Sequence, residues 1–427
     1  MNCHHFLKKT SLLSLFFIFT SIPLYPESPL LVTGYFKNFS VIFNFPQVEN
    51  DPVGLFPGQP VGMVNNRLRL NLNYQANKTL SFAFSYSLSF RIQDNYLFSQ
   101  KPVVTGVELF RYRFDDLRLQ LYPSREKQPT SFALFQNLDR AYCTVKTGPA
   151  DIYLGRQAIA WGSARVLNPT DVIAPFTFDE LDTEDRIGVD ALRIRIPLGF
   201  MGEIDSGWVF GKDFRFSRSA AFIRGKFYIA RTDVSLLLLN FQENLLVGWD
   251  LARSIGGAGF WLEGAYVLVK AFKEGFPGRK QNYLRFTTGL DYSFSSKIYG
   301  FLEYHYSGAG VYEPGDYLEN ISRPGVAEGS VYLMGKHYLA PGLSWQITPL
   351  LTLSGQALLN LTDPSCFIAP SLDYNIAENI YLAGGAFIGA GKKPALTFKS
   401  TGLSELVYSS EFGGYPDIFF TSFRIYF

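Results

Sequence analysis

The residues that could do chemistry in this sequence are mainly cations repeated at every second position. Arg67 and Arg69, and again Arg193 and Arg195, are separated by a single apolar residue. In an extended chain, residues two apart point to the same side. Guanidinium groups donate hydrogen bonds in a fixed fork that suits carboxylates and phosphates. The spacing therefore indicates a surface that attracts anions.

Other reactive side chains are sparse and scattered. The acidic run Asp179–Asp185 could bind Ca²⁺ weakly, but it lacks the glycine-containing spacing of an EF-hand, so we favour a loop that faces the arginines. His305 and His337 occur without a Gly-x-Ser-x-Gly elbow. Cys143 and Cys366 are too few for a CxxC redox pair or a zinc cluster, and a disulfide between them is a minor alternative. We predict no enzyme, with no catalytic, metal-binding or cofactor-binding residues.

The composition fits a sheet exposed to lipid better than a soluble enzyme. Aromatic residues make up 16 % of the 427 residues and charged residues only 18 %, whereas typical globular chains carry about 25 % charged residues. The net charge of +2 argues against a nucleic-acid-binding protein, which would carry a strong basic excess.

The N-terminus has the layout of a secretory signal peptide. Lys8 and Lys9 precede the apolar stretch Leu12–Phe19, and the chain turns polar near Glu27. The stretch is shorter than the roughly 20 residues that a membrane-spanning helix needs. We therefore expect residues 1–27 to be cleaved and residues 28–427 to form the mature domain.

Period-two alternation is the main structural signal. Between Leu80 and Ile92, apolar side chains fall on one face, and serine, alanine and arginine fall on the other. One face suits lipid and the other suits water. Comparable segments recur near the following residues: 67–74, 192–196, 223–229, 284–292, 301–306 and 351–359.

Short and long connections alternate along the chain. The long ones lie near the following residues: 41–63, 95–102, 161–185, 271–279, 309–330 and 391–415. Short turns on one side and long loops on the other are typical of a transmembrane antiparallel β-barrel. We expect an all-β barrel of about 18–20 strands, with an even number. A soluble β-sandwich or propeller is the alternative, but no blade-length repeat is present.

The last strand carries a second signal. Phe419, Phe423, Ile425 and the terminal Phe427 share one face. This pattern resembles the C-terminal strand of Gram-negative outer-membrane proteins, which implies recognition by the barrel-assembly machinery. Because an open sheet edge is not tolerated in lipid, this strand should pair with the first one, near Leu31–Val41.

The segment Leu138–Phe176 carries a family resemblance. It contains Leu154-Gly155-Arg156-Gln157, then Trp161-Gly162-Ser163, then Asn168-Pro169-Thr170-Asp171. This run resembles one found in porin-like outer-membrane barrels, grouped loosely with the alginate-export and carbohydrate-porin families. The resemblance implies a cell outer-membrane location, contact with membrane lipid and small hydrophilic solutes, and no nucleic-acid partner.

We expect the loop Trp161–Asp185 to fold inward and narrow a pore, with Arg156 and Arg165 near the constriction; a surface loop is the alternative. Because Arg156 shares a face with Leu154, we expect a bulge near Gly155 or a position at the rim. The predicted pore-lining residues are Arg67, Arg69, Arg91, Arg111, Arg113, Arg156, Arg165, Arg193, Arg195, Arg224, Lys226 and Arg285.

These features favour a channel for passive diffusion of small hydrophilic solutes, anionic or sugar-like. Arginine-rich walls favour anions, although an arginine network that merely braces the wall against acids is an equal alternative. A polysaccharide export or anchoring barrel, a surface adhesin and an outer-membrane hydrolase are competing functions. The polar lumen and the lack of a catalytic set favour the channel.

Overall fold

A computed structural model describes residues 29–52, 54–99, 110–117, 119–124, 131–273, 281–398 and 404–427. The expected signal peptide lies outside the described residues. The wall strands in chain order are β1 (Leu30–Asn44), β2 (Val61–Gln75), β3 (Leu80–Gln93), β5 (Phe132–Lys146), β6 (Asp151–Gln157), β7 (Val189–Leu198), β8 (Gly202–Val209), β9 (Ala220–Ile229), β10 (Thr232–Phe241), β11 (Asn244–Ile255), β12 (Ala258–Leu268), β13 (Tyr283–Ser293), β14 (Ile298–Ser307), β15 (His337–Thr348), β16 (Leu351–Asn360), β17 (Ser365–Ala377), β18 (Ile380–Ala390) and β21 (Asp417–Tyr426).

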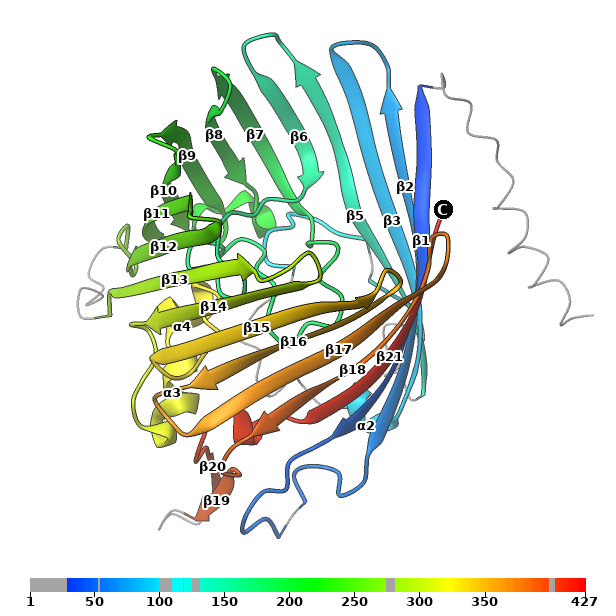
Figure 1. Ribbon diagram of the computed structural model, residues 1–427, viewed down its shortest axis with the longest axis vertical. Helices are drawn as coiled ribbons and strands as arrows, with labels where there is room; N and C mark the ends of the chain where they lie inside the picture. The colour runs from blue at the N-terminus through cyan, green and yellow to red at the C-terminus, as the bar shows by residue number, and fades with distance from the viewer. Residues whose placement is uncertain are drawn as a thin grey trace, which may run out of the picture.

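The described strands form a closed antiparallel barrel (Figure 1). Nineteen strands share one sheet, and leaving out the three-residue β4 (Gln120–Tyr122) gives eighteen that close the ring. Closure runs between β1 and β21, as predicted for the first and last strands. Here the Gly34 N–H donates to the Phe427 carbonyl at 2.7 Å, and the Phe427 N–H donates back at 3.0 Å. Every wall strand thus has two neighbours, which removes the unpaired edge.

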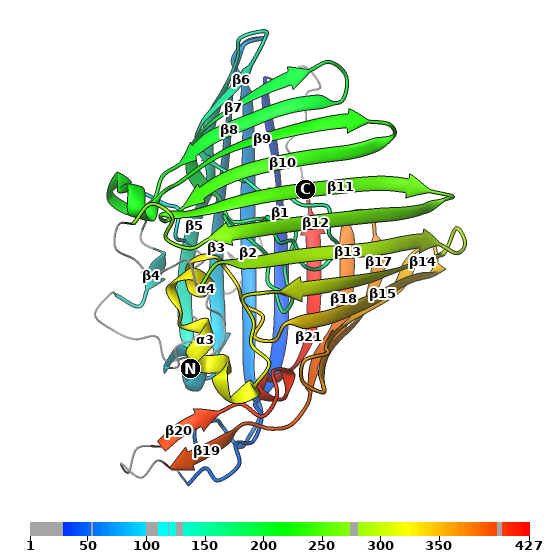
Figure 2. The same cartoon turned by 90° about the vertical axis from the view of Figure 1, so that its left-hand side faces the viewer.

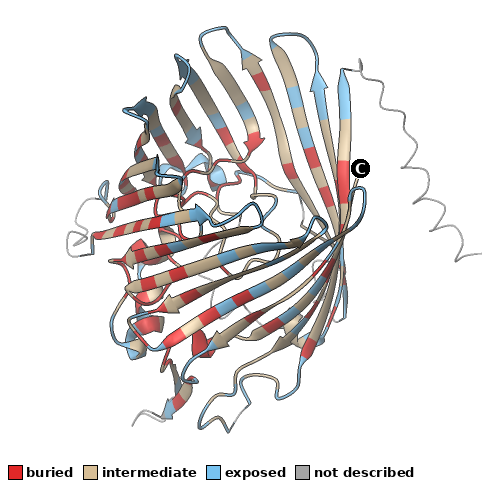
Figure 3. Ribbon diagram, in the orientation of Figure 1, coloured by how far each residue is buried: buried red, intermediate tan, exposed pale blue. Residues whose placement is uncertain are grey.

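Residues of differing burial alternate along many of the wall strands (Figure 3), as the alternation in the sequence predicts. On β3, the side chains of Phe82 and Phe84 are exposed on the outside, whereas Ser85 and Ser87 are buried inside. The run of four leucines belongs to β10, where Leu236 and Leu238 are exposed on the outside and the alternating Leu237 and Leu239 are buried inside. An apolar exterior on a closed barrel matches a lipid environment.

The two ends of the barrel differ. Most short turns join strands at one end, for example between β7 and β8 and between β17 and β18. The long connections lie at the other end, together with α2 (Asn95–Ser99), α3 (Tyr317–Ile321), α4 (Pro324–Glu328) and the ribbon of β19 (Ala395–Phe398) and β20 (Ser404–Val407) (Figure 2). By the usual rule for such barrels, the long connections are extracellular.

No helix among the described residues combines the length and the apolar character needed to cross a bilayer. The two cysteines of the described chain, Cys143 and Cys366, are both free thiols, so the minor alternative of a disulfide is wrong.

Strand β6 is unusually short, and a separate segment completes the wall beside it. Residues 110–117 and 119–124 lie between β5 and β7 at the long-loop end: the Gln136 N–H donates to the Leu119 carbonyl at 2.7 Å, and the Asp190 N–H donates to the Tyr112 carbonyl at 3.0 Å. Arg111 and Arg113 therefore lie on irregular backbone, whereas the alternation had suggested a strand.

Candidate functional site

The connection between β6 and β7, residues 158–188, runs inside the barrel (Figure 1). Its first attachment is to Glu303 on β14. The Glu303 carboxylate accepts the backbone N–H of Arg165 at 2.7 Å and of Leu167 at 2.9 Å, and the indole N–H of Trp261 at 3.1 Å. A buried carboxylate is tolerated only when hydrogen-bond donors replace its hydration. The wall carboxylate and the N–H groups of the connection therefore supply each other's hydrogen-bond partners.

A second carboxylate repeats this arrangement on β12, which is separated from β14 by one strand, β13. Glu263 accepts the Thr170 N–H at 2.9 Å, the Thr170 hydroxyl at 2.7 Å and the Ser163 N–H at 3.0 Å. The Ser163 hydroxyl in turn donates to Asp250 on β11 at 2.5 Å. Three wall carboxylates thus fix residues 163–170 against one side of the lumen.

At the other end of the connection the roles are reversed: the connection supplies the carboxylates and the wall supplies the cations. Lys37 on β1 lies 2.7 Å from Asp182 and 2.6 Å from Glu184. Arg69 on β2 lies 3.4 Å from Asp185. The interpretation of the acidic run as a segment facing basic residues is therefore confirmed. Residues 158–188 therefore cross the lumen from β11–β14 to β1–β2, and we call them the bridge.

The bridge also has an apolar side. The Trp161 ring lies 4.7 Å from that of Phe222 on the inner wall, and Ile159 and Val172 are fully buried in a cluster that includes Leu237. The inner face of β7–β12 is therefore apolar where the bridge covers it. This explains why the wall does not alternate cleanly between lipid-compatible and water-compatible residues in this region.

A cavity of about 410 Å³ lies beside the bridge. Arg165, Arg186 and Arg285 line it, together with Asp171 and Glu180. Arg186 pairs with Asp171, and Arg165 lies 2.6 Å from Asp291. Arg285 donates to the carbonyl of a bridge residue at 2.9 Å. The cavity thus gathers three guanidinium groups: Arg165 and Arg186 are paired with carboxylates, and Arg186 and Arg285 each donate to a backbone carbonyl.

The two acids of this cavity have altered proton affinities. Burial raises the pKa of Glu180 to about 7, and the nearby carboxylates of Asp179 and Asp182 add to the effect. Burial also raises the pKa of Asp171 to about 6, although the guanidinium of Arg186 opposes the shift. Near neutral pH, Glu180 is therefore only partly charged.

Two further cavities continue from the first toward the short-turn end. A cavity of about 550 Å³ shares Thr183, Gln356 and Phe387 with the first one. A third cavity, of about 480 Å³, shares Asp373 and Arg424 with the second. The shared residues place the three cavities end to end along the inner wall of β14–β18 and β21.

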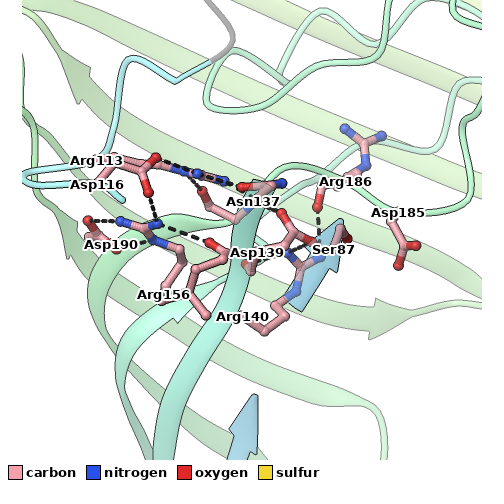
Figure 4. Close-up of polar contacts among 12 residues, drawn as sticks. Ser87, Arg113, Asp116, Asn137, Asp139, Arg140, Arg156, Asp185, Arg186 and Asp190 are labelled. Atoms are coloured by element: carbon pink, nitrogen blue, oxygen red, sulfur yellow. Dashed lines mark hydrogen bonds and ion pairs between the residues drawn. The ribbon is translucent and has the colours of Figure 1, made fainter. Parts of the chain in front are cut away.

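A polar seam joins the irregular segment 110–117 to the wall (Figure 4). Arg156, at the end of β6, lies 2.7 Å from both Asp116 and Asp190. Arg113 donates to the Gly188 carbonyl at 2.9 Å and pairs with Asp116 at 2.6 Å. The two guanidinium groups are buried and their carboxylate partners are only slightly exposed, so the ion pairs favour one arrangement of the two segments.

The seam corrects two expectations. Arg156 lies in the wall among Asp116 and Asp190, whereas we expected it beside Arg165 near the constriction. The strand register is continuous through Gly155, whose φ of +120° favours glycine, so there is no bulge there. The register shift lies instead in β5, where Asp139 is skipped opposite Ser85 and Tyr86.

The other predicted residues are mostly partnered. Arg67 lies 3.3 Å from Asp182, and Arg69 lies 2.8 Å from Asp139. The rest are as follows: Arg91 lies over the Phe135 ring, Arg111 donates to the carbonyls of Ala327 and Glu328, Arg193 pairs with Asp205, Arg195 with Glu203 and Lys226 with Asp233, and Arg224 donates to Ser235. Many of these arginines brace the structure, as the alternative interpretation held.

Three cations of this region were left out of the predicted pore-lining set. Lys37 was not selected because it is a single lysine in an otherwise uncharged strand. Arg186 and Arg424 were left out of the pore-lining set, yet both line the cavities. Alternation did assign Arg424, Glu263 and Glu303 to the inner face, but it carries no information about the backbone N–H groups that two of these residues bind.

Searches of known proteins locate similar structures but no related sequence. No protein-family model matches the chain, and no curated protein matches it. Among solved structures, OccK8 (OprE) of Pseudomonas aeruginosa is similar at a TM-score of 0.55 and 10 % identity, over 93 % of this chain and 98 % of that one. The chain has the fold of the outer-membrane porins.

Two further structures support this assignment of the fold. A BenF-like porin from Pseudomonas fluorescens Pf-5 gives a TM-score of 0.54 at 11 % identity, covering 93 % of this chain and 98 % of that one. OccAB3 of Acinetobacter baumannii gives 0.55 at 9 % identity, covering 93 % and 99 %. With its closed strands and apolar exterior, the protein is a transmembrane β-barrel of the outer membrane.

Proposed function

We propose that the protein is a porin-like channel, and not an enzyme, through which small hydrophilic solutes diffuse passively across the outer membrane. The observation that carries the proposal is the row of three cavities that share lining residues. A polar route beside a bridge fixed across the lumen is what a diffusion channel with a constriction needs. In this proposal, Arg165 and Arg285 line the narrow part.

We propose a preference for anionic or sugar-like solutes. Arg165, Arg186 and Arg285 surround the first cavity, and Glu180 is partly protonated near neutral pH. This leaves an excess of positive charge facing the route, which favours anions. The structure of Pseudomonas aeruginosa OpdK with vanillate, similar at a TM-score of 0.50 and 7 % identity, offers a precedent for a carboxylate in this fold.

The proposal extends to how the chain reaches the membrane. We propose that residues 1–27 direct export and are removed, leaving residues 28–427 as the mature barrel. We also propose that the barrel-assembly machinery recognises the last strand, which ends at Phe427 and supplies one side of the closing seam.

Liposome swelling tests the channel directly. Proteoliposomes in an isotonic solution of a small sugar should swell, and the rate should fall as the solute grows from a monosaccharide to a tetrasaccharide. Absence of swelling for every solute would contradict the proposal and favour an adhesin. Flux of long polysaccharides only in the presence of periplasmic proteins would favour an export barrel.

Planar bilayers under a salt gradient test the preference for anions. We expect a reversal potential of anion-selective sign. A cation-selective sign would contradict the preference while leaving the channel itself in place.

A further inference from the structure

A short exposed segment joins β8 and β9 at the long-loop rim of the barrel (Figure 2). It contains two helical turns, η2 (Lys212–Phe214) and η3 (Phe216–Arg218). Every side chain from residue 212 to residue 218 is exposed. We call residues 212–218 the β8–β9 rim.

The rim continues the lipid-facing aromatic surface of the wall. Trp208 on β8 pairs in register with Leu192, and both side chains are exposed on the outer face. The Phe216 ring lies 6.2 Å from that of Trp208 and 6.0 Å from that of Phe272. Amphipathic and aromatic side chains gather at this level because headgroups and acyl chains meet there.

A second aromatic pair extends this exposed aromatic surface, which we call the patch, toward Phe114. Phe214 lies 4.4 Å from Phe114, and 54 % and 46 % of these side chains are exposed. A run of exposed phenylalanines of this kind marks a surface that binds something apolar. Acyl chains at the membrane boundary provide such a partner.

The same seven residues carry excess positive charge. Lys212, Arg215 and Arg218 provide three cations, and Asp213 is the acid among them, 4.0 Å from Arg215 and 3.3 Å from Arg218. Subtracting the carboxylate leaves a formal charge of +2 on the rim. Asp116 lies near the rim, beyond the Phe114–Phe214 contact, but it is already paired with two arginines and so does not neutralise the cations of the rim.

We propose that the β8–β9 rim binds the phosphate groups of a phosphorylated lipid in the outer leaflet. The three cations meet the phosphates, and the acyl chains lie along Phe216 and Trp208. Basic residues beside a membrane surface attract anionic headgroups, and guanidinium groups suit phosphate oxygens. The adjoining aromatic surface favours a lipid over a soluble phosphate, because only a lipid uses both halves of the patch. This inference does not depend on the barrel conducting solutes.

Native mass spectrometry of the folded, full-length protein in detergent tests the inference. The probes are lipid A with two phosphates, lipid A with one, and inorganic phosphate. We expect affinity to follow phosphate number, with inorganic phosphate failing to compete at equal concentration. The triple variant Lys212→Gln, Arg215→Gln, Arg218→Gln should bind diphosphorylated lipid A at least about tenfold more weakly, because basic residues beside a membrane surface attract anionic headgroups.

A matched triple variant removes the same charge at the opposite end. Lys78, Arg231 and Lys297 are exposed on short turns, and replacing all three by glutamine should leave binding unchanged. A second variant, Phe216→Ser with Phe272→Ser, should weaken lipid A while leaving weak phosphate binding as it was.

Three outcomes would overturn the inference: full binding by the rim triple variant, an equal loss in the control triple variant, or competition by inorganic phosphate as strong as by lipid A. Heat-modifiable electrophoretic mobility verifies that each variant is folded. Because the rim lies outside the proposed route, its variants should conduct as the parent does, so failure here is separable from failure of the channel.

Discussion

The carboxylate of Glu303 on β14 holds the backbone of Arg165 on the bridge, with 2.7 Å between the oxygen and the amide nitrogen. The same carboxylate also accepts the amide of Leu167. The guanidinium of Arg165, which lines the first cavity, is thereby placed by a residue on the barrel wall. The position of the bridge and the width of the route are therefore linked.

The first prediction concerns this anchor. Glu303→Gln replaces one acceptor oxygen by an amide donor, so the bridge loses charge-assisted hydrogen bonds worth on the order of 1–3 kcal/mol each. In planar bilayers we expect larger and noisier single-channel currents. Glu378→Gln, which makes the same change on an exposed short turn, is the control. Currents identical to those of the parent would show that the anchor does not define the route.

The second prediction concerns the opposite attachment. The side chain of Lys37 is 1 % exposed and lies between Asp182 and Glu184. Lys37→Met leaves both carboxylates without this cation, at a cost on the order of 1 kcal/mol, because both retain access to water and Asp182 keeps Arg67 as a partner. We expect a lower thermal unfolding midpoint and faster proteolysis of the bridge.

A double-mutant cycle tests the contact itself. Because Lys37 and Asp182 interact directly, Lys37→Met combined with Asp182→Asn should destabilise the barrel by less than the sum of the single changes. If the two losses in free energy of unfolding were strictly additive, that result would contradict the contact.

The third prediction is a pH dependence. Since the folded pKa of Glu180 is about 7, lowering the pH from 8 to 5.5 should protonate it and make the first cavity more positive. Anion selectivity, measured as a reversal potential, should therefore increase as pH falls. At every pH in this range, Glu180→Gln should show the anion selectivity that the parent shows at pH 5.5, so its pH profile should be flatter. A profile unchanged by the substitution would assign the effect to other groups.

The same shift has a consequence for stability. A carboxyl whose folded pKa lies above its ordinary value binds more protons in the folded state, so its contribution to the free energy of unfolding falls as pH rises through the window from about 4.5 to about 7. Glu180→Gln should remove this part of the pH dependence.

The fourth prediction concerns the closing seam. A side chain at Gly34 would collide with the Arg69 carbonyl and with the Phe427 ring 2.8 Å away. Gly34→Ala should therefore reduce the yield of folded, heat-modifiable barrel. Gly58→Ala is the control, because a Cβ there meets no atom within 4 Å. Equal yields for the two variants would mean that the seam tolerates the collision.

Much of the wall could be predicted from the sequence, because alternation is a local property. The faces of β3 and the inward position of Glu303 follow from a period of two, and the pairing of β1 with β21 follows from the need to close the sheet in lipid. The same alternation predicted about 18–20 strands, a range that includes the eighteen that close the barrel. The exceptions lie where the inner wall is covered: Leu237 is buried beneath the bridge, and no local pattern distinguishes that environment from lipid.

The candidate site was predicted only in part, because its contacts join residues far apart in the chain. The Lys37–Asp182 pair spans 145 positions, and Arg156 is neutralised by Asp116 and Asp190 of other segments. The irregular backbone at Arg113 also broke the assumed alternation. Inward-pointing arginines were identified, but whether each has a partner depends on tertiary structure.

The most direct test of the account uses Gln356, which lines both the first and the second cavity. Gln356→Trp should fill the junction between them. Leu353→Trp is the matched control, because Leu353 lies on the same strand with its side chain exposed on the outer face. In planar bilayers, we predict that Gln356→Trp lowers single-channel conductance by at least about half while Leu353→Trp leaves it unchanged. Full conductance in Gln356→Trp would contradict a solute route along these cavities.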